Sequence, residues 1–123
     1  MTYQVEVNEV GTFWRLNGDL HRKDGPAAEY ADGTKFWYRN GKLHREDGPA
    51  VEWASGAKSW YRNGKLHRED GPAIEYANGS KEWWLNGKQY TKKGFNRVIK
   101  KVIPEYTMEE AIKLIGHEFK IKK

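Results

Sequence analysis

The chain contains no cysteine and no long hydrophobic run. The absence of cysteine excludes disulfides and thiol chemistry, and it fits a reducing compartment. No stretch approaches the roughly 18 consecutive apolar residues that a membrane span requires. The first residues also lack the basic start and apolar stretch of a signal peptide. We therefore expect a cytoplasmic protein that does not enter the membrane, in the host cytoplasm if its origin is viral.

Charge is distributed unevenly along the 123 residues, which carry a net charge of +5. Residues 1–91 hold 13 Lys/Arg and 13 Asp/Glu, so their charges cancel. Residues 92–123 hold nine Lys/Arg against four Glu, so the whole excess lies in the last quarter. The sequence therefore divides into a neutral, aromatic-rich body and a basic C-terminal segment.

An internal repeat of 23 residues runs through the body. Trp14, Trp37, Trp60 and Trp83 are spaced 23 apart, and residues 37–59 and 60–82 agree at 18 of 23 positions. A fixed period of this length is typical of repeat architectures, in which each unit stacks on its neighbours. A repeated residue is also a poor catalytic candidate, because a catalytic constellation is usually needed once.

Each unit contains two turn signals that predict a β-hairpin. In the second unit these are Asp32-Gly33 and Asn40-Gly41, because Asx-Gly pairs accept the positive φ angles of hairpin turns. Pro49 then ends the pairing, since proline has no N–H to donate. The spacing predicts about four hairpins in an antiparallel meander, with residues 4–16 as a degenerate first unit.

The first turn sets which side chains share a face. A two-residue turn at Asp32-Gly33 would pair Tyr30 with Lys35 and Ala28 with Trp37. Side chains alternate along a strand, so these four would lie on one face, which we predict to be the buried one. The equivalent residues of the later units are Val51, Trp53, Lys58 and Trp60, then Ile74, Tyr76, Lys81 and Trp83.

The C-terminal segment is predicted to protect the end of this sheet. Phe95, Val98, Ile99 and Val102 follow helical spacing, and a second helix at 108–115 and a short strand at 117–121 are expected beyond Pro104. The predicted fold is therefore mainly β: a hairpin-repeat sheet at residues 1–91 with a basic helical segment at 92–123 packed on the same domain.

With the repeat Asn40-Gly41-Lys42-Leu43-His44-Arg45-Glu46-Asp47-Gly48-Pro49-Ala50, residues 4–91 resemble MORN-type repeats, in the variant form of phage and bacterial proteins. The resemblance implies a hairpin-per-repeat sheet and a non-enzymatic scaffold or binding role. Tyr38 occupies the position of the standard repeat's tryptophan and Phe36 that of its glycine, so lipid binding is not implied. A phage protein of this size would act by occupying, and inhibiting, a host protein.

Several repeated residues have both a structural and a functional interpretation. The histidines His21, His44 and His67 invite a metal site, but equivalent residues two strands apart lie ~10 Å from each other. Zinc ligands lie ~2 Å from the ion, so we expect no metal there and a hydrogen bond from each histidine to its own loop. We also expect each Arg-x-Asp of the loops, as in Arg45 and Asp47, to hold its loop through an Arg–carboxylate pair or through Asp accepting backbone N–H groups. A row of arginines presented to an anionic partner is the alternative.

The repeated tryptophans are expected to form a stacked core, with base stacking as the alternative. Tyr38-Arg39 and Tyr61-Arg62 occur only in the two central units. Together these four residues are our candidate site for a partner or ligand, because such pairs can stack on rings and bind anions. The alternative is that the outer units differ because they contact the ends of the sheet.

The basic segment is a candidate for phosphate contacts, with a solvated helix face as the alternative. Its candidate residues are Lys92, Lys93, Arg97, Lys100 and Lys101. No nucleophile–base pair, phosphate loop or carboxylate dyad stands out, so we expect no catalysis and no cofactor. The leading hypothesis is binding to a host protein by a monomer or homodimer. Sequestration of a small anionic ligand such as a nucleotide, and nucleic-acid binding, are the alternatives.

Overall fold

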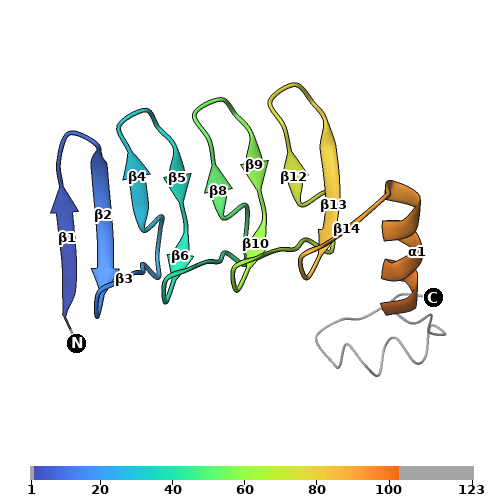
Figure 1. Cartoon of the computed structure of the whole chain (residues 1–123), viewed down its shortest axis with the longest axis horizontal. Helices are drawn as coiled ribbons and strands as arrows, with labels where there is room; N and C mark the ends of the chain where they lie inside the picture. The colour runs from blue at the N-terminus through green and yellow to red at the C-terminus, as the bar shows by residue number, and fades with distance from the viewer. Residues whose placement is uncertain (1, 103–123) are drawn as a thin grey trace, which may run out of the picture.

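The computed structural model describes residues 2–102, which form an open antiparallel sheet with a helix at one end (Figure 1). The prediction of a mainly β hairpin repeat is confirmed. The predicted second helix at 108–115 and the strand at 117–121 lie outside the described residues. Among residues 2–102 no helix has the length and apolar character needed to cross a membrane.

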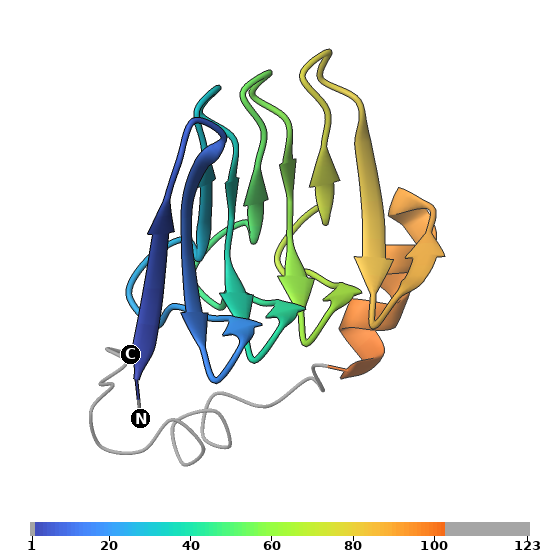
Figure 2. The ribbon, with the colours of Figure 1, turned by 60° about the vertical axis from the view of Figure 1, so that its left-hand side comes forward.

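Four units follow one another across the sheet, at residues 3–26, 27–49, 50–72 and 73–91. In each, one long hairpin belongs to the main sheet, and a second, short hairpin lies along the lower edge (Figures 1 and 2). The strands of the first two units are β1 (Tyr3–Val7), β2 (Gly11–Leu16), β3 (Asp19–Leu20), β4 (Ala28–Tyr30), β5 (Lys35–Phe36), β6 (Tyr38–Arg39) and β7 (Lys42–Leu43). Those of the last two are β8 (Val51–Glu52), β9 (Lys58–Ser59), β10 (Tyr61–Arg62), β11 (Lys65–Leu66), β12 (Ile74–Glu75), β13 (Lys81–Leu85) and β14 (Lys88–Tyr90).

The main sheet has the strand order β1-β2-β4-β5-β8-β9-β12-β13-β14, with β3 paired to β2. β6 pairs with β7 and β10 with β11 in two small sheets. Asn40 and Gly41 both have positive φ, at 52° and 78°. They join Arg39 to Lys42 as the two-residue turn that the sequence predicted.

The upper hairpins differ from prediction by one residue. Ala28 pairs with Phe36 and Glu29 with Lys35, so the predicted pairs Tyr30–Lys35 and Ala28–Trp37 are wrong. The loop has three residues, because the N–H of Gly33 donates to the carbonyl of Tyr30 at 2.9 Å and Gly33 adopts a φ of 98°. A three-residue hairpin loop of this kind ends in a residue with positive φ, which only glycine adopts without strain.

This shift changes which residues share a face, because a slip of one residue moves every side chain of a strand to the other side. We call the two sides the aromatic face and the arginine face. Tyr30, Phe36, Trp53 and Tyr76 project from the aromatic face with Ala28, Val51 and Ile74. Trp37, Trp60 and Trp83 project from the arginine face with Lys35, Lys58 and Lys81.

The core is thin, as in a single-layer sheet. The alanines directly before β4, β8 and β12, which are Ala27, Ala50 and Ala73, are fully buried. On the aromatic face Val51 and Ser59 are 1% exposed, and they are cross-strand partners. The repeated tryptophans are only half-buried, so the predicted buried face of tryptophans is not the core of this protein.

Helix α1 (Lys92–Val102) lies at the β14 end of the sheet and contacts β13 and β14 (Figure 1). Phe95 is buried, and Val98 and Ile99 are half-buried. Thr91 is the N-cap residue of the helix, since its Oγ1 accepts a hydrogen bond from the Gly94 N–H at 3.0 Å. The predicted amphipathic helix is therefore present, and it covers one end of the sheet.

Candidate functional site

The arginine face is built on one contact that recurs in three units. The guanidinium carbon of Arg22 lies 4.1 Å from the ring centroid of Trp14, that of Arg45 lies 4.0 Å from Trp37, and that of Arg68 lies 3.8 Å from Trp60. This is a cation–π arrangement. Among residues 2–102 the aromatic pairs join none of the repeated tryptophans to another. The predicted stack of tryptophans is thus replaced by tryptophan–arginine pairs.

Each stacked arginine also joins two units. Arg45 donates from Nε to Asp47 at 3.0 Å, and from Nη1 to the Pro49 carbonyl at 3.0 Å and to Glu52 at 3.1 Å. Glu52 belongs to the next hairpin, so one guanidinium connects its own tryptophan and loop to the neighbouring strand. Arg68 repeats the pattern. The predicted Arg–Asp loop pairs are confirmed in these two units, whereas Arg22 pairs with Glu29, at 3.8 Å.

The histidines connect the short hairpins of neighbouring units. Nδ1 of His44 accepts a hydrogen bond from the backbone N–H of Asn63 at 3.0 Å, and His21 and His67 do the same for Asn40 and Asn86. The predicted bond to the histidine's own loop is also present in the second and third units. Nε2 of His44 lies 3.2 Å from Glu46, and Nε2 of His67 lies 2.9 Å from Glu69. The pKa of Glu46 is lowered by its hydrogen bonds to His44 and to Arg39.

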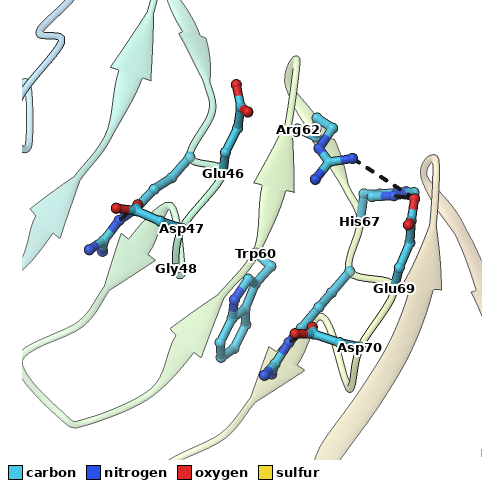
Figure 3. A pocket seen from close by; sticks show the side chains of 10 residues that line it. Glu46, Asp47, Gly48, Trp60, Arg62, His67, Glu69 and Asp70 are labelled. Carbon is cyan, nitrogen blue, oxygen red and sulfur yellow. Dashed lines mark hydrogen bonds and ion pairs between the residues drawn. The ribbon is translucent and has the colours of Figure 1, made fainter. Parts of the chain in front are cut away.

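Two open grooves lie between successive loops on this face. One has a volume of about 530 Å³ and the other about 660 Å³. In the first, Trp60 lies between the loop of Asp47 and the loop of Asp70, with Arg62 at one side (Figure 3). Among residues 2–102 no group of three His, Asp or Glu side chains is arranged to hold a metal ion.

The structure divides the candidate residues Tyr38, Arg39, Tyr61 and Arg62 between the two faces. Tyr38 and Tyr61 lie two residues after Phe36 of β5 and Ser59 of β9, so alternation places them on the aromatic face. The ring of Tyr38 lies 6.2 Å from that of Phe36. Burial raises the pKa of both tyrosines. The two arginines are exposed, line the grooves of the arginine face, and pair with Glu46 at 3.3 Å and Glu69 at 3.9 Å.

The aromatic face carries rings in two rows. The upper row has Tyr30, Trp53 and Tyr76, and the lower row has Tyr38, Tyr61 and Trp84; each row has a spacing of 23 residues. Trp53 and Tyr76 are 39% and 43% exposed. Edge-to-face contacts connect Phe13, Tyr30, Phe36 and Tyr38 in sequence, with ring centroids 5.4–6.2 Å apart.

At the C-terminal end of this face, a carboxylate joins the two rows. Glu82 accepts hydrogen bonds from the hydroxyl of Tyr76 at 2.6 Å and from Nε1 of Trp84 at 2.9 Å. The first of these bonds raises the pKa of Tyr76. From β4 to β12 the residues that project from this face are uncharged.

Sequence reasoning missed this surface because it placed the upper row on the same face as Trp37, Trp60 and Trp83. The 23-residue spacing of Tyr30, Trp53 and Tyr76 was a usable signal. A three-residue loop ending in Gly33 would have assigned them to the correct side.

The basic residues lie on one side of α1. Lys92, Lys93, Arg97 and Lys100 are exposed, whereas Phe95, Val98 and Ile99 face the sheet. The side chain of Lys101 lies outside the described residues. No acidic residue lies in the first turn of the helix.

Comparison with known protein families, curated proteins and solved structures finds no match to this chain.

Proposed function

We propose that this protein is a non-enzymatic binding protein that holds a partner protein on its aromatic face. The observation that supports the proposal most is the pair of aromatic rows on a strip of sheet that carries no charge from β4 to β12. The cores of protein interfaces are depleted in charged residues and enriched in tyrosine and tryptophan. Trp53 and Tyr76 are the most exposed of these rings, so we assign them as the main contacts.

The rigidity of the platform favours binding. Tyr30 and Phe36 lie in strands β4 and β5, which pair on both sides. The rings of Phe13, Tyr30, Phe36 and Tyr38 are already in contact with one another. Fewer side-chain rotamers are then lost when a partner binds, which lowers the entropic cost of association. Tyrosine and tryptophan supply large contact areas and are over-represented among energetically dominant interface residues.

The resemblance to MORN-variant repeats of phage and bacterial proteins supports a host protein in the cytoplasm as the partner. On this proposal the protein acts by occupying its partner, and inhibition of a host factor is the consequence. The residues used for recognition are those of the sheet, so no cofactor is required.

The arginine face supports binding of an anionic ligand less well. The groove around Trp60 contains Arg45, Arg62 and Arg68, but it also contains four carboxylates. Each of these arginines already pairs with a carboxylate, so an incoming phosphate would have to displace an internal ion pair. Nucleic-acid binding relies on α1 alone, because residues 1–91 carry no net charge.

The experiment compares capture of a host protein by the wild-type chain and by two variants. Trp53→Ala combined with Tyr76→Ala removes the exposed rings, whereas Lys23→Glu changes an exposed loop residue of the arginine face. Each purified protein is incubated with host lysate, recovered and weighed by native mass spectrometry, after circular dichroism has confirmed its fold. We expect a partner of fixed stoichiometry with wild type and Lys23→Glu, and at least a tenfold loss of capture with the double variant.

A photo-crosslinking residue at position 53 or 23 provides a second readout that does not depend on affinity. The proposal requires crosslinks to the partner from position 53 and none from position 23. Capture that is unchanged in the double variant would reject the aromatic face. A small added mass on the wild-type protein would instead indicate a sequestered ligand.

A further inference from the structure

The two ends of the main sheet differ in whether another element covers the edge strand. At one end α1 packs against β13 and β14, and at the other end the outer edge of β1 is unpaired within residues 2–102 (Figure 1). All five residues of β1 are exposed. An unpaired edge presents free N–H and C=O groups and is a template for another strand.

The direction of the free peptide groups follows from one hydrogen bond. The N–H of Asn8 donates to the carbonyl of Gly11 at 3.0 Å, so the peptide group of Asn8 faces β2. Peptide groups alternate in direction along an antiparallel strand. Gln4 and Glu6 therefore also face β2, and the N–H and C=O groups of Tyr3, Val5 and Val7 face away from the sheet.

The same three residues carry apolar side chains on one face. Tyr3, Val5 and Val7 are 45%, 47% and 73% exposed, and by their register with Trp14 they project from the arginine face. Natural edge strands are usually protected by lysine, proline or a bulge. β1 has none of these and carries one charge, at Glu6.

We propose that β1 pairs with the β1 strand of a second copy of this chain, antiparallel, around a two-fold axis that passes between the two copies of Val5. In this register Val5 exchanges both of its hydrogen bonds with the partner's Val5, and Tyr3 lies opposite the partner's Val7. Six backbone hydrogen bonds form, and six apolar side chains cover the junction on the arginine face. On the aromatic face Gln4 lies opposite the partner's Glu6.

The residues of β1 favour this register over the two neighbouring ones. An axis at Glu6 would place two carboxylates directly opposite each other, which destabilises a strand pair. An axis at Gln4 would place Val7 opposite residue 1 of the partner, outside β1. The axis at Val5 pairs every residue from Tyr3 to Val7 and sets each glutamate against a neutral amide donor.

Five residues from each copy form a small contact, well below the roughly 1,200 Å² at which stable interfaces begin. The dimer is therefore weak and depends on concentration. Because the axis is perpendicular to the sheet, the aromatic faces of both copies lie on the same side. The interface itself uses none of the rings assigned to the partner protein, so this inference is independent of the proposed function.

Sedimentation velocity of the untagged full chain, over a hundredfold range of concentration, tests the proposal with the variant Val5→Pro. Proline at this position removes an N–H that faces outward, so no hydrogen bond between β1 and β2 is lost, and edge strands tolerate proline in this orientation. Val5→Thr is the matched control, because it keeps the N–H and the β-branched shape. We expect a monomer–dimer equilibrium for wild type and Val5→Thr, and a monomer at every concentration for Val5→Pro.

The register has its own test, which also serves if Val5→Pro fails to fold. Gln4→Lys places a cation opposite the partner's Glu6 at two symmetric positions, so the dissociation constant should fall about threefold to tenfold at low salt. Gln4→Glu should raise it by a similar factor. An axis at Gln4 would reverse the first result, because two lysines would then face each other.

Three outcomes would overturn the proposal. One is a wild-type chain that stays monomeric throughout, with a rapidly exchanging Val5 amide. The second is a monomer whose Val5 amide is protected from exchange, because a segment of the same chain would then occupy the edge. The third is a dimer that is unaffected by Val5→Pro, since it would use another surface.

Discussion

The Nδ1 atom of His44 accepts a hydrogen bond from the backbone N–H of Asn63, 3.0 Å away in the turn of the following unit. Asn63 has a positive φ of 51°, so the imidazole holds a strained turn residue in place. Because Nδ1 is an acceptor, the neutral ring carries its proton on Nε2 and donates it to Glu46. A single buried side chain therefore couples two repeats.

Replacement of this histidine should destabilise the sheet. We expect His44→Ala to lower the free energy of unfolding by about 1–3 kcal/mol, since it removes a buried side chain and leaves the Asn63 N–H without its acceptor. The measurement is urea unfolding followed by tryptophan fluorescence. His21→Ala is the matched control, because His21 makes the same bond to Asn40 at 2.9 Å. His21 is less buried than His44, and the residue equivalent to Glu46 in its unit is Lys23. An equal loss in both variants would show that burial and the Glu46 contact contribute nothing.

The stacked arginines should not be replaceable by lysine. Arg45→Lys keeps the charge but cannot stack on Trp37 and donate to Asp47, Pro49 and Glu52 together. We expect a loss of about 1–2 kcal/mol in the free energy of unfolding.

Arg62→Lys is the control for this prediction. Arg62 is exposed and makes one long ion pair with Glu69, at 3.9 Å, so its replacement should cost less than about 0.5 kcal/mol. Chemical denaturation of both variants gives the comparison, and equal costs would mean that the stacking on Trp37 adds no stability.

Replacing Gly11 or Gly33 by alanine should lower the free energy of unfolding, for different reasons at the two positions. A Cβ at Gly11 would overlap the carbonyl oxygen of Glu29 on the neighbouring strand, so Gly11→Ala should push β2 from β4 and cost about 3 kcal/mol. A Cβ at Gly33 would meet no atom within 4 Å, but the φ of 98° remains unfavourable for alanine, at a cost of about 1 kcal/mol. Thermal unfolding distinguishes the two, and the reverse order would contradict the register of β2 against β4.

The loop of the second unit should be sensitive to acid. The N–H of Thr34 donates to Oδ1 of Asp32 at 2.9 Å, and this bond lowers the pKa of Asp32 below its ordinary value of 3.8. A carboxyl with a lowered folded pKa contributes stability above its unfolded pKa, and that contribution is lost as the pH falls through the folded pKa. The effect is therefore confined to acid conditions and absent at neutral pH.

Asp32→Asn tests this prediction, because Asn78 makes the same bond to Ser80 in the fourth unit. The urea midpoints of wild type and Asp32→Asn should differ by a constant amount between pH 5 and pH 8, and wild type should lose stability relative to the variant below about pH 4. Parallel curves down to pH 2 would show that the carboxylate is not held by Thr34.

Much of the fold could be predicted from the sequence because its signals are local. The Asn-Gly turns of the short hairpins, which begin at Asn17, Asn40, Asn63 and Asn86, each have two residues with positive φ. Phe95, Val98 and Ile99 form the inner side of α1. The upper hairpins could not be predicted to the residue. Asp32-Gly33 fits both a two-residue turn and the last two positions of a three-residue loop, and local preference does not distinguish them.

Which rings share a face depends on the one extra residue of the three-residue loop. Because side chains alternate with a period of two, the longer loop puts Trp37 on the face opposite Tyr30. Tyr38 and Arg39 lie on opposite faces whatever the loop length, because they are neighbours in β6, so tyrosines and arginines contribute to different sites. The stacking of Arg45 on Trp37 joins residues eight apart through a loop, which no periodicity of a strand predicts.

The 23-residue period, the hairpin in each unit, the neutral body and the basic end can be read from the chain, since each follows from spacing, turn chemistry or counted charge. The register, the division into an aromatic and an arginine face, and the bond from His44 to Asn63 become visible only in the folded protein. These three features depend on how neighbouring hairpins pack. Contacts from the carbonyls and side chains of one unit fix the loop conformation of the next unit, whose own sequence is compatible with more than one.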